Sequence, residues 1–428
     1  MGLIRPVTVA SVDAPGAVAA AADFVCDGTD DQVQLQAAHD ALPSTGGAVY
    51  LSLGNFYLSD TWTVDSESVA VIGANWGQRT GATQNAVGTR LNAVSGFAGG
   101  EVIRVARVGA DRPVYGVLLR DFAIDGGDFG TGVDGIYLSS NRYMVEHVHV
   151  HQMSGDGVIV EGTTGWDTYD SVMAFCEIAD CAGAGLRMGA DSADGHLVHC
   201  ILYNNADNWV NEGGGSQQIT GCHFYNGTRY NLYFNGSGSR TKVSNCKIEG
   251  AGQHGVCIDS TNGGYADLQF VGNGFSTNGD SADNTYDHLN ITGPSANGVT
   301  RTLIVGNSFG WKGAGVSPNK PRYGVNFSSA SQFALVTGNT FGSATQFGTG
   351  PVGSLGSSSA EAKVKNNVNH TSTEDLTPPP GVPMFITWPG GSWPARSTVT
   401  SDSTRLVIWV GGSTQPSGMA TDDLWIHD

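Results

Sequence analysis

Two carboxylates, Glu212 and Asp259, are the residues best placed by sequence for acid–base chemistry. Glu212 stands in NWVNEGG and Asp259 ends HGVCID, and both follow short alternating segments typical of strands. If these segments stack as coils of one repeat, the carboxyl groups lie two coils apart, about 9 to 10 Å. That is near the wide separation of an inverting glycosidase, where a water molecule fits between the two groups. The alternative is that Glu212 points inward, because a shift of one residue would turn it over.

Five further side chains fall at outward positions of the same segments and form a plausible lining for a sugar groove. They are Tyr137, Glu161, Arg187, Tyr233 and Asn235. Glu161 and Arg187 fall on adjacent coils, so we expect them to form a plain ion pair. The alternative interpretation is that all of these are scattered, solvated polar residues on the side of a solenoid.

Two groups could hold a metal ion. His147, His149 and His151 alternate along one strand, so they share a face, and we expect that face to be exposed. The acidic run from Asp280 to Asp287 could bind Ca²⁺, but it lacks the order of a calcium loop, so a solvated loop is expected. We predict no metal ion and no other cofactor.

A repeated strand places these residues. One position recurs every 22 to 34 residues between 114 and 369, and like residues follow like along this series. The series is Phe122, Val148, Cys176, Cys200, Cys222, Cys246, Asn273, Asn307, Asn339 and Asn367. Repeats of this length indicate a solenoid or an array, and stacked identical side chains are what a parallel coil produces.

A second ladder precedes the first, as in DGIYL at 134, DGVIV at 156 and HGVCI at 254. Each coil therefore has at least two strands, joined by turns rich in Gly, Asn, Asp and Ser. We predict an all-β chain, a right-handed parallel β-helix with an N-terminal capping helix and a small C-terminal β module. The cysteines are expected to stay reduced inside it, although neighbouring coils could bring two within disulfide range.

Five regions follow along the chain. Residues 1–22 are expected to be an arm, and residues 23–113 the cap and first coils. In the cap, Thr29 or Asp30 would begin a helix whose apolar face holds Val33, Leu35, Ala37, Ala38 and Leu42. Residues 114–370 are the β-helix, 371–383 a Pro-rich linker, and 384–428 a Trp-rich β module of three short strands. The Trp residues of this module either pack its core or stack on sugars.

Composition excludes several classes of protein. The chain has 428 residues, 62 of them Gly, and a net charge of −18. Strong negative charge disfavours binding to nucleic acid or to anionic membrane surfaces. The chain contains no run of 18 apolar residues and begins without a recognisable signal peptide, so neither membrane insertion nor secretion is expected.

The segment FVCDGTDDQVQLQAA…GGAVYLSLGNFY resembles the N-terminal signature of the pectate-lyase-like β-helix superfamily. The matching residues are Asp27, Gly28, Asp30, Asp31, Gln36, Gly46, Gly47, Gly54 and Tyr57, whereas the family's Pro before the turn is replaced by Ser52 or Leu53. The resemblance implies the fold and not a reaction. A catalytic role for Asp30 or Asp31 is a lesser alternative.

This form of the signature, with the pattern W-P…V-x-W-x-G…D-D-L-W-I near the end, is similar to tail proteins of actinobacteriophages. The resemblance implies a homotrimeric tailspike or minor tail protein of the virion, assembled in the host cytoplasm. Such a protein would bind a host cell-surface polysaccharide or glycolipid and contact other tail proteins. One alternative is a polysaccharide depolymerase, either a hydrolase or a lyase. A secreted pectin-degrading enzyme is a further alternative, disfavoured because the catalytic motifs of those families are missing.

Overall fold

The computed structural model describes most of the chain up to residue 369 and three short strands beyond it. The described residues are 6–76, 88–109, 112–127, 131–163, 165–293, 298–313, 315–327, 331–332, 334–353, 363–369, 384–387, 407–410 and 424–426. The predicted linker 371–383, residues 77–87, Trp388 and Trp393 lie outside them. In the described part, no helix is both long and apolar enough to cross a bilayer.

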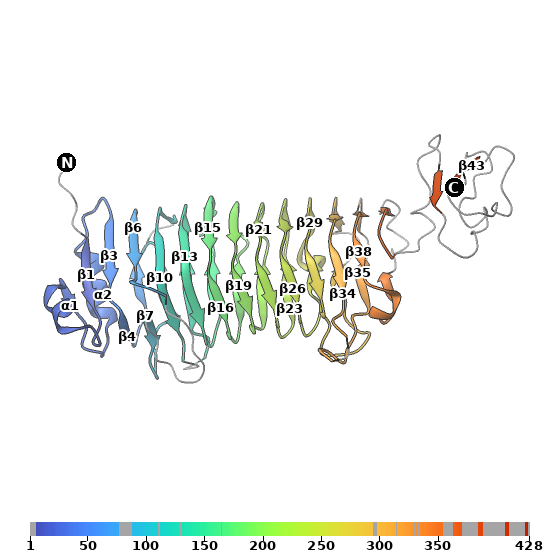
Figure 1. Cartoon of the computed structure of the whole chain (residues 1–428). Coiled ribbons are helices and arrows are strands. Elements are labelled where there is room, and N and C mark those ends of the chain that lie inside the picture. The colour runs from blue at the N-terminus through green and yellow to red at the C-terminus, as the bar shows by residue number, and fades with distance from the viewer. Residues whose placement is uncertain are drawn as a thin grey trace.

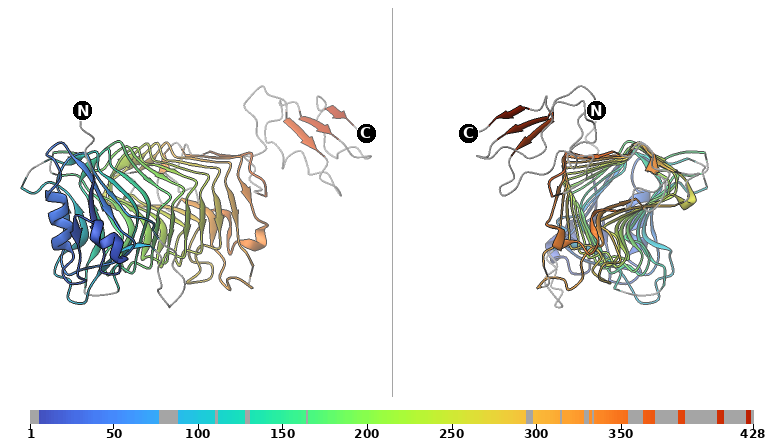
Figure 2. Two further views of the ribbon diagram at one scale, coloured as in Figure 1. Left: turned by 60° about the vertical axis from the view of Figure 1, so that its left-hand side comes forward. Right: turned by 90° about the vertical axis from the view of Figure 1, so that its right-hand side faces the viewer.

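Short parallel strands stack coil upon coil along one axis, as the sequence predicted (Figure 1). Most coils contribute three strands, two to a first sheet and one to a second, and successive coils superpose when viewed along the axis (Figure 2). In the described residues the first sheet has 23 strands and the second has 11. The molecule is therefore a parallel β-helix whose outer faces are lined by columns of residues from successive coils.

The first sheet consists of two rows. The first row is β2 (Phe24–Val25), β1 (Val7–Ala10), β3 (Gly47–Leu51), β6 (Val69–Ile72), β10 (Leu118–Asp125), β13 (Met144–His151), β15 (Ser171–Ala174), β18 (Gly195–Val198), β21 (Gln218–Thr220), β25 (Lys242–Ser244), β29 (Gln269–Val271), β33 (Leu303–Val305), β37 (Leu335–Thr337) and β40 (Lys363–Lys365). The second row is β4 (Gly54–Leu58), β7 (Thr89–Ala93), the second halves of β10 and β13, β16 (Glu177–Ala179), β19 (Ile201–Tyr203), β22 (His223–Tyr225), β26 (Lys247–Glu249), β30 (Gly274–Ser276), β34 (Ser308–Gly310) and β38 (Thr340–Phe341).

The second sheet carries the predicted site. Its strands are β5 (Trp62–Val64), β8 (Glu101–Val105), β11 (Asp134–Leu138), β14 (Val158–Val160), β17 (Ala184–Met188), β20 (Asp207–Asn211), β23 (Tyr230–Asn235), β27 (Val256–Asp259), β31 (Leu289–Thr292), β35 (Tyr323–Phe327) and β39 (Gly350–Val352). Short strands pair at the remaining corners, namely β9 (Val114–Tyr115) with β12 (Ser140–Asn141), and β24 (Gly238–Ser239), β28 (Tyr265–Ala266), β32 (Val299–Thr300) and β36 (Ser331–Gln332) in a row.

Single residues with left-handed backbone turn the chain between strands. Between the two rows of the first sheet, one such residue stands in each successive coil, and we call these positions the corner column. From β10 onward the corner column is Asp121, His147, Phe175, His199, Gly221, Asn245, Gly272, Gly306, Gly338 and Asn366. Gly, Asn and Asp adopt this conformation at little cost, whereas bulky side chains rarely do.

The interior confirms the predicted ladder. Cys176, Cys200, Cys222 and Cys246 stack in register, and all seven cysteines are buried and form no disulfide. The asparagine half continues the column, because the side-chain amide of Asn273 donates to the Oδ1 of Asn307 at 3.0 Å, and the pattern repeats to Asn339 and Asn367. A second internal ladder of Asn208, Asn231 and Asn278, joined by bonds of 2.7 and 3.1 Å, was not predicted.

The N-terminal end is capped by α2 (Gln32–Asp40), which contacts β1, β2 and β5. Leu35 and Ala38 are buried as predicted, but Val33 is 59% exposed. The N-cap residue is Asp31, and neither Thr29 nor Asp30 caps this helix. The Asp31 carboxylate accepts the backbone N–H groups of Gly28 and Tyr57, so it ties the cap to β4.

The N-terminal residues differ from the expectation of an arm, whereas the C-terminal strands agree with it. Residues 7–10 form β1, which pairs with β2 and β3 and so belongs to the first coil, and α1 (Gly16–Ala21) follows it. Beyond the solenoid, three strands occur where they were predicted, and they pair in parallel. These are β41 (Met384–Thr387), β42 (Val407–Val410) and β43 (Leu424–Ile426). Two short 3₁₀ helices, η1 (Ser260–Asn262) and η3 (Ala344–Gln346), lie in loops.

Candidate functional site

Polar side chains gather on the outer face of the second sheet, which we call the second-sheet face. The strand register arranges them in three columns that run along the axis. The first column, at the starts of the strands, is Glu101, Asp134, Asp156, Ala184, Asp207, Tyr230, His254 and Asp287. The second is Arg104, Tyr137, Ile159, Arg187, Val210, Tyr233 and Cys257. The third contains Glu161, Glu212, Asn235 and Asp259.

Carboxylates of the first column are held by the backbone of the next coil. The Oδ1 of Asp134 accepts the N–H of Asp156 at 2.6 Å, and the Oδ1 of Asp156 accepts the N–H of Ala184 at 2.7 Å. Burial, with the neighbouring charge of Asp156, raises the pKa of the Asp134 carboxyl to about 6. Asp134 can therefore hold a proton close to neutral pH, as a general acid must.

Arg187 joins the first and third columns. Its Nε donates to the Oδ2 of Asp156 at 2.6 Å, and its guanidinium lies 3.6 Å from a carboxylate oxygen of Glu212. Burial opposes the charge of Arg187, but Asp156 and Glu212 raise its pKa, so it stays a cation. The half-buried guanidinium thus neutralises two carboxylates and fixes their side chains at the surface.

Aromatic rings lie beside this cluster on the following coils. The rings of Tyr230 and Tyr233 are 4.8 Å apart, and the Arg229 guanidinium lies 5.7 Å and 5.9 Å from their centroids. Arg229 also bonds the carboxylate of Asp207. Burial raises the pKa of Tyr233 to about 12, so its hydroxyl keeps its proton and can donate a hydrogen bond.

At the far end of the first column, His254 is a neutral imidazole and Asp287 is paired with Arg322. The Nδ1 of His254 accepts the N–H of Asp287 at 3.0 Å, and burial lowers the pKa of His254 to about 4. Arg322 binds both carboxylate oxygens of Asp287, at 3.0 and 2.7 Å. Asp287 is fully buried, so the expectation that this acidic run forms a solvated loop is wrong at Asp287.

Asp259 and Asn235 are engaged by a local turn. The Oδ1 of Asp259 accepts the backbone N–H and the hydroxyl of Thr261, at 2.9 and 2.6 Å, and so caps η1. The Oδ1 of Asn235 accepts the side-chain amide of Asn262 at 2.8 Å. One oxygen of Asp259 therefore has a structural role, and the other remains for a ligand.

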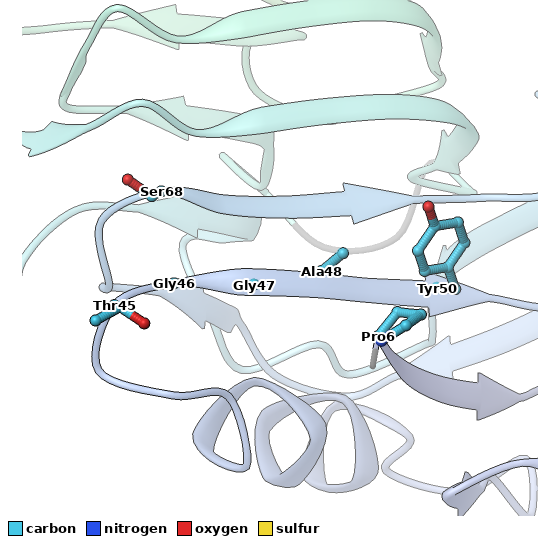
Figure 3. Close-up of a pocket in the computed structure, with 7 residues that line it drawn as sticks. All are labelled: Pro6, Thr45, Gly46, Gly47, Ala48, Tyr50 and Ser68. Atoms are coloured by element: carbon cyan, nitrogen blue, oxygen red, sulfur yellow. The ribbon is translucent and has the colours of Figure 1, made fainter. Parts of the chain in front are cut away.

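A hollow at the N-terminal end lies apart from these charged columns. It is lined by Pro6, Thr45, Gly46, Ser68 and three residues of β3, namely Gly47, Ala48 and Tyr50 (Figure 3). Tyr50 is the one titratable side chain in its lining, so the hollow offers little for acid–base chemistry. The three charged columns described above lie instead on the second-sheet face.

Residues 134–309 match the family model described as the right handed beta helix region. This segment is a right-handed β-helix. No curated protein sequence matches the chain.

Solved structures show the same right-handed β-helix over most of the chain. DFA-IIIase from Arthrobacter chlorophenolicus, in complex with GF2, has a TM-score of 0.60 and 14% identity, over 86% of this chain and 95% of that chain. The A-module of a mannuronan C-5 epimerase from Azotobacter vinelandii has 0.55 and 18%, over 80% and 96%. Tailspike protein 2 of an Escherichia coli O157:H7 bacteriophage has 0.54 and 15%, over 73% of this chain and 40% of its own. At such identities the likeness establishes the fold.

The predicted site residues all belong to the second-sheet face. Tyr137, Arg187 and Tyr233 share the second column, as the aligned segments predicted. Glu212 points outward, with its side chain 39% exposed. It stands in the third column one coil before Asn235 and two before Asp259, but it contacts Arg187, whereas Asp259 contacts Thr261.

Two expectations about side chains of the β-helix are wrong. Arg187 pairs with Asp156 and Glu212, because its side chain reaches both neighbouring columns, and not with Glu161. The expected exposed histidine face does not exist either. His147 occupies the corner column with left-handed backbone, and His149 and His151 are only 4% and 1% exposed.

Asp134, Asp156, Asp207, Arg229, Tyr230 and Arg322 were missed as site residues. The aligned strand segments contain a usable signal, because their first letters read Asp, Asp, Ala, Asp, Tyr, His and Asp. Alternation from Tyr137 leads back to Gly135 and not to Asp134, and both Gly135 and Ile136 are buried. A strict period of two therefore does not reach the first column.

Proposed function

We propose that the protein binds a cell-surface polysaccharide along the second-sheet face. The observation that carries the proposal is that every coil from Tyr137 to Tyr233 presents at least one Tyr, Arg or carboxylate side chain on this face, although Ile159 and Val210 interrupt the second column. Such a row offers ring faces, donors and acceptors at the regular coil spacing of about 4.8 Å. A linear chain of sugar units, with a hydroxyl pattern that repeats along its length, is the ligand that a row of this kind fits.

The charge of the row favours a neutral polysaccharide. Arg187 and Arg229 are both bound to carboxylates of the protein, so neither is a free cation for an acidic sugar. Glu161 and Asp259 add negative charge nearby. A polyanion would meet net repulsion on this surface, whereas hydroxyl groups can bond to carboxylate, guanidinium and phenol alike.

The protein that carries this surface would be a phage tail protein of the tailspike or minor tail class. This assignment is supported by the capping signature around Asp27 to Asp31 and by the terminal pattern that includes Trp409 and Trp425. The fold shared with a tailspike protein is compatible with it. In the virion the chain would form a homotrimer, attach to other tail proteins and contact a host polysaccharide or the sugar part of a glycolipid.

A polysaccharide hydrolase or lyase is the second candidate. It is favoured by Asp134, whose carboxyl pKa of about 6 suits a proton donor. Asp156 adjoins Asp134, and Arg187 could stabilise negative charge that develops on a substrate. Glu212 and Asp259 remain candidates for a second carboxylate, with Asp259 limited by its bonds to Thr261.

The deciding experiment incubates the purified chain with envelope polysaccharides from a panel of actinobacteria. Bound polysaccharide is measured by co-sedimentation, and soluble products by mass spectrometry. Intact polysaccharide in the pellet would identify a binding protein. A ladder of regular oligosaccharides would identify a depolymerase, and its end groups would separate hydrolysis from elimination. If no polysaccharide is bound or cleaved, the proposal is wrong.

Variants locate the activity on the chain. Arg187→Ala, Glu212→Gln and Asp259→Asn each change one group of the second-sheet face. Arg301→Ala is the matched control, because it removes an arginine bound to a carboxylate, Asp267, away from this face. We expect Arg187→Ala to weaken binding about tenfold and the control to leave it unchanged.

A further inference from the structure

A row of aromatic side chains marks a different face of the β-helix, at the bend of the first sheet. Trp76, His147, Phe175 and His199, which we call the aromatic row, follow one another along the axis. Three of them occupy successive positions of the corner column. Their backbone is left-handed, with φ of 50° at His147, 53° at Phe175 and 51° at His199.

The rest of the corner column shows what this bend requires. The coils that follow use Gly221, Asn245, Gly272, Gly306 and Gly338, all residues that tolerate positive φ. Bulky side chains are unfavourable in this conformation, and strained backbone tends to persist where it serves a function. Three consecutive coils therefore place rings at a bend where the later coils have Gly or Asn.

The rings are stacked with an offset and remain open to solvent. The centroids of His147 and Phe175 are 5.4 Å apart and those of Phe175 and His199 are 5.6 Å apart, both more than the coil spacing. Such offset stacking leaves part of each ring face uncovered. Phe175 is 44% exposed, and Ile201, which pairs with Glu177 on the adjacent coil, is 39% exposed. Exposed rings that follow one another along the axis indicate an interaction surface.

Hydrogen-bonding groups run parallel to the aromatic row on the second row of the first sheet. The hydroxyl of Tyr203 donates to the carboxylate of Glu177 at 2.7 Å, and the His149 ring nitrogen lies 3.3 Å from the same oxygen. Tyr203 stacks on Tyr225 with centroids 4.7 Å apart. Glu177 stays partly exposed, with 25% of its side chain accessible. This face thus carries the aromatic row next to polar side chains that are fixed by hydrogen bonds.

We propose that this face is a second polysaccharide-binding surface, separate from the second-sheet face. The aromatic row is one ring wide, and a carboxylate and tyrosine hydroxyls lie next to it. Its rings can stack on the apolar faces of sugar units aligned with the axis, and the polar groups can bond to the sugar hydroxyls. A protein partner would be expected to cover a broader apolar area than one row. The inference rests on the proposed function, because it assigns a second contact to the same class of ligand. Two such faces would let one molecule hold two strands of a surface polysaccharide and so gain avidity.

Phe175→Asn tests the proposal, because Asn suits the left-handed backbone and removes the ring. We expect about tenfold weaker binding to the envelope polysaccharide that the intact chain binds, with the melting temperature unchanged within about 2 °C or raised. Arg240→Asn is the matched control, since Arg240 is exposed and left-handed at another bend, with φ of 58°. It should leave binding unchanged. Equal binding by Phe175→Asn and the unsubstituted chain would overturn the proposal.

Hydroxyl-radical footprinting separates this surface from the second-sheet face. With the bound polysaccharide, oxidation of Phe175 and His199 should fall together with that of Tyr137 and Tyr233. Protection of the two tyrosines alone would overturn the second surface and leave the proposed function intact. If no polysaccharide binds at all, both fail. Weaker self-association of Phe175→Asn in sedimentation, with unchanged polysaccharide binding, would instead assign the row to contact between chains.

Discussion

The Oδ1 of Asp134 accepts a hydrogen bond of 2.6 Å from the backbone N–H of Asp156, one coil further along the axis. The bond holds the Asp134 carboxyl against the sheet, where burial and the charge of Asp156 favour its protonated form. The second-sheet face therefore contains one carboxyl that titrates near neutrality beside one that is paired with Arg187. A carboxyl with a raised pKa beside a fixed cation is suited to donate a proton.

Asp134→Asn should make the protein more stable at pH 7 by about 1 kcal/mol, after allowance for solvent screening. The folded pKa of about 6 lies above the ordinary 3.8, so the folded chain binds more protons between these values. Stability of the unsubstituted chain therefore falls as the pH rises through this window, and the substitution removes that fall. Urea denaturation at several pH values measures both. A parallel pH dependence in the two proteins would contradict the assigned pKa.

Arg187→Ala should raise the pKa of Asp134 further above 6. Arg187 is a positive charge that lowers this pKa, and its removal leaves Asp156 as an unpaired negative neighbour. Titration of the Asp134 carboxyl carbon by NMR would measure the change. Arg301→Ala serves as control, because Arg301 pairs with Asp267 on another face. An unchanged or lowered pKa would show that Arg187 does not act on Asp134.

Glu249→Gln should lower stability at neutral pH by about 1 kcal/mol and remove part of the acid sensitivity. Burial opposes ionisation of Glu249, but hydrogen bonds from Lys247, Lys312 and His223 lower its pKa to about 2. Its contribution is therefore complete above pH 4.5 and is lost as the pH falls toward 2. Thermal unfolding at pH 7 and pH 3 should show a smaller difference between proteins at pH 3. A difference that does not shrink would exclude this ion cluster as the cause.

Asn307→Ala should destabilise the solenoid more than Cys200→Ala. Asn307 accepts from the backbone and side chain of Asn273 and donates to Asn339 and to the carbonyl of Phe270. Truncation leaves several buried polar groups without partners, which costs about 3 kcal/mol, whereas the thiol of Cys200 makes only weak bonds. We expect about 1 to 2 kcal/mol for Cys200→Ala. Denaturant unfolding measures the loss of unfolding free energy in each variant. A larger loss for Cys200→Ala would show that packing contributes more than hydrogen bonding to the stability of this column.

Much of the solenoid was predictable because stacking gives a side chain at a given position the same surroundings in every coil. The cysteine and asparagine column was visible as recurring letters, and Asn367 completes it with a bond of 3.0 Å to Asn339. The site was predictable only in part. Tyr137, Arg187 and Tyr233 followed from alternation, whereas Asp134 and Asp156 sit before the alternation begins.

The amino-acid sequence by itself determined the β-helix and the register of its strands, since these depend on local alternation and on like residues stacking on like. It left open whether Glu212 points outward or inward, and the structure shows that it points outward. Tertiary structure alone decided the partners of Arg187, the burial of His149 and His151, and the left-handed corner that exposes Phe175. Those outcomes depend on side-chain reach between columns and on backbone torsions at single residues. Side-chain reach leaves no periodic signal along the chain, and the residue type at Phe175 does not indicate a left-handed backbone.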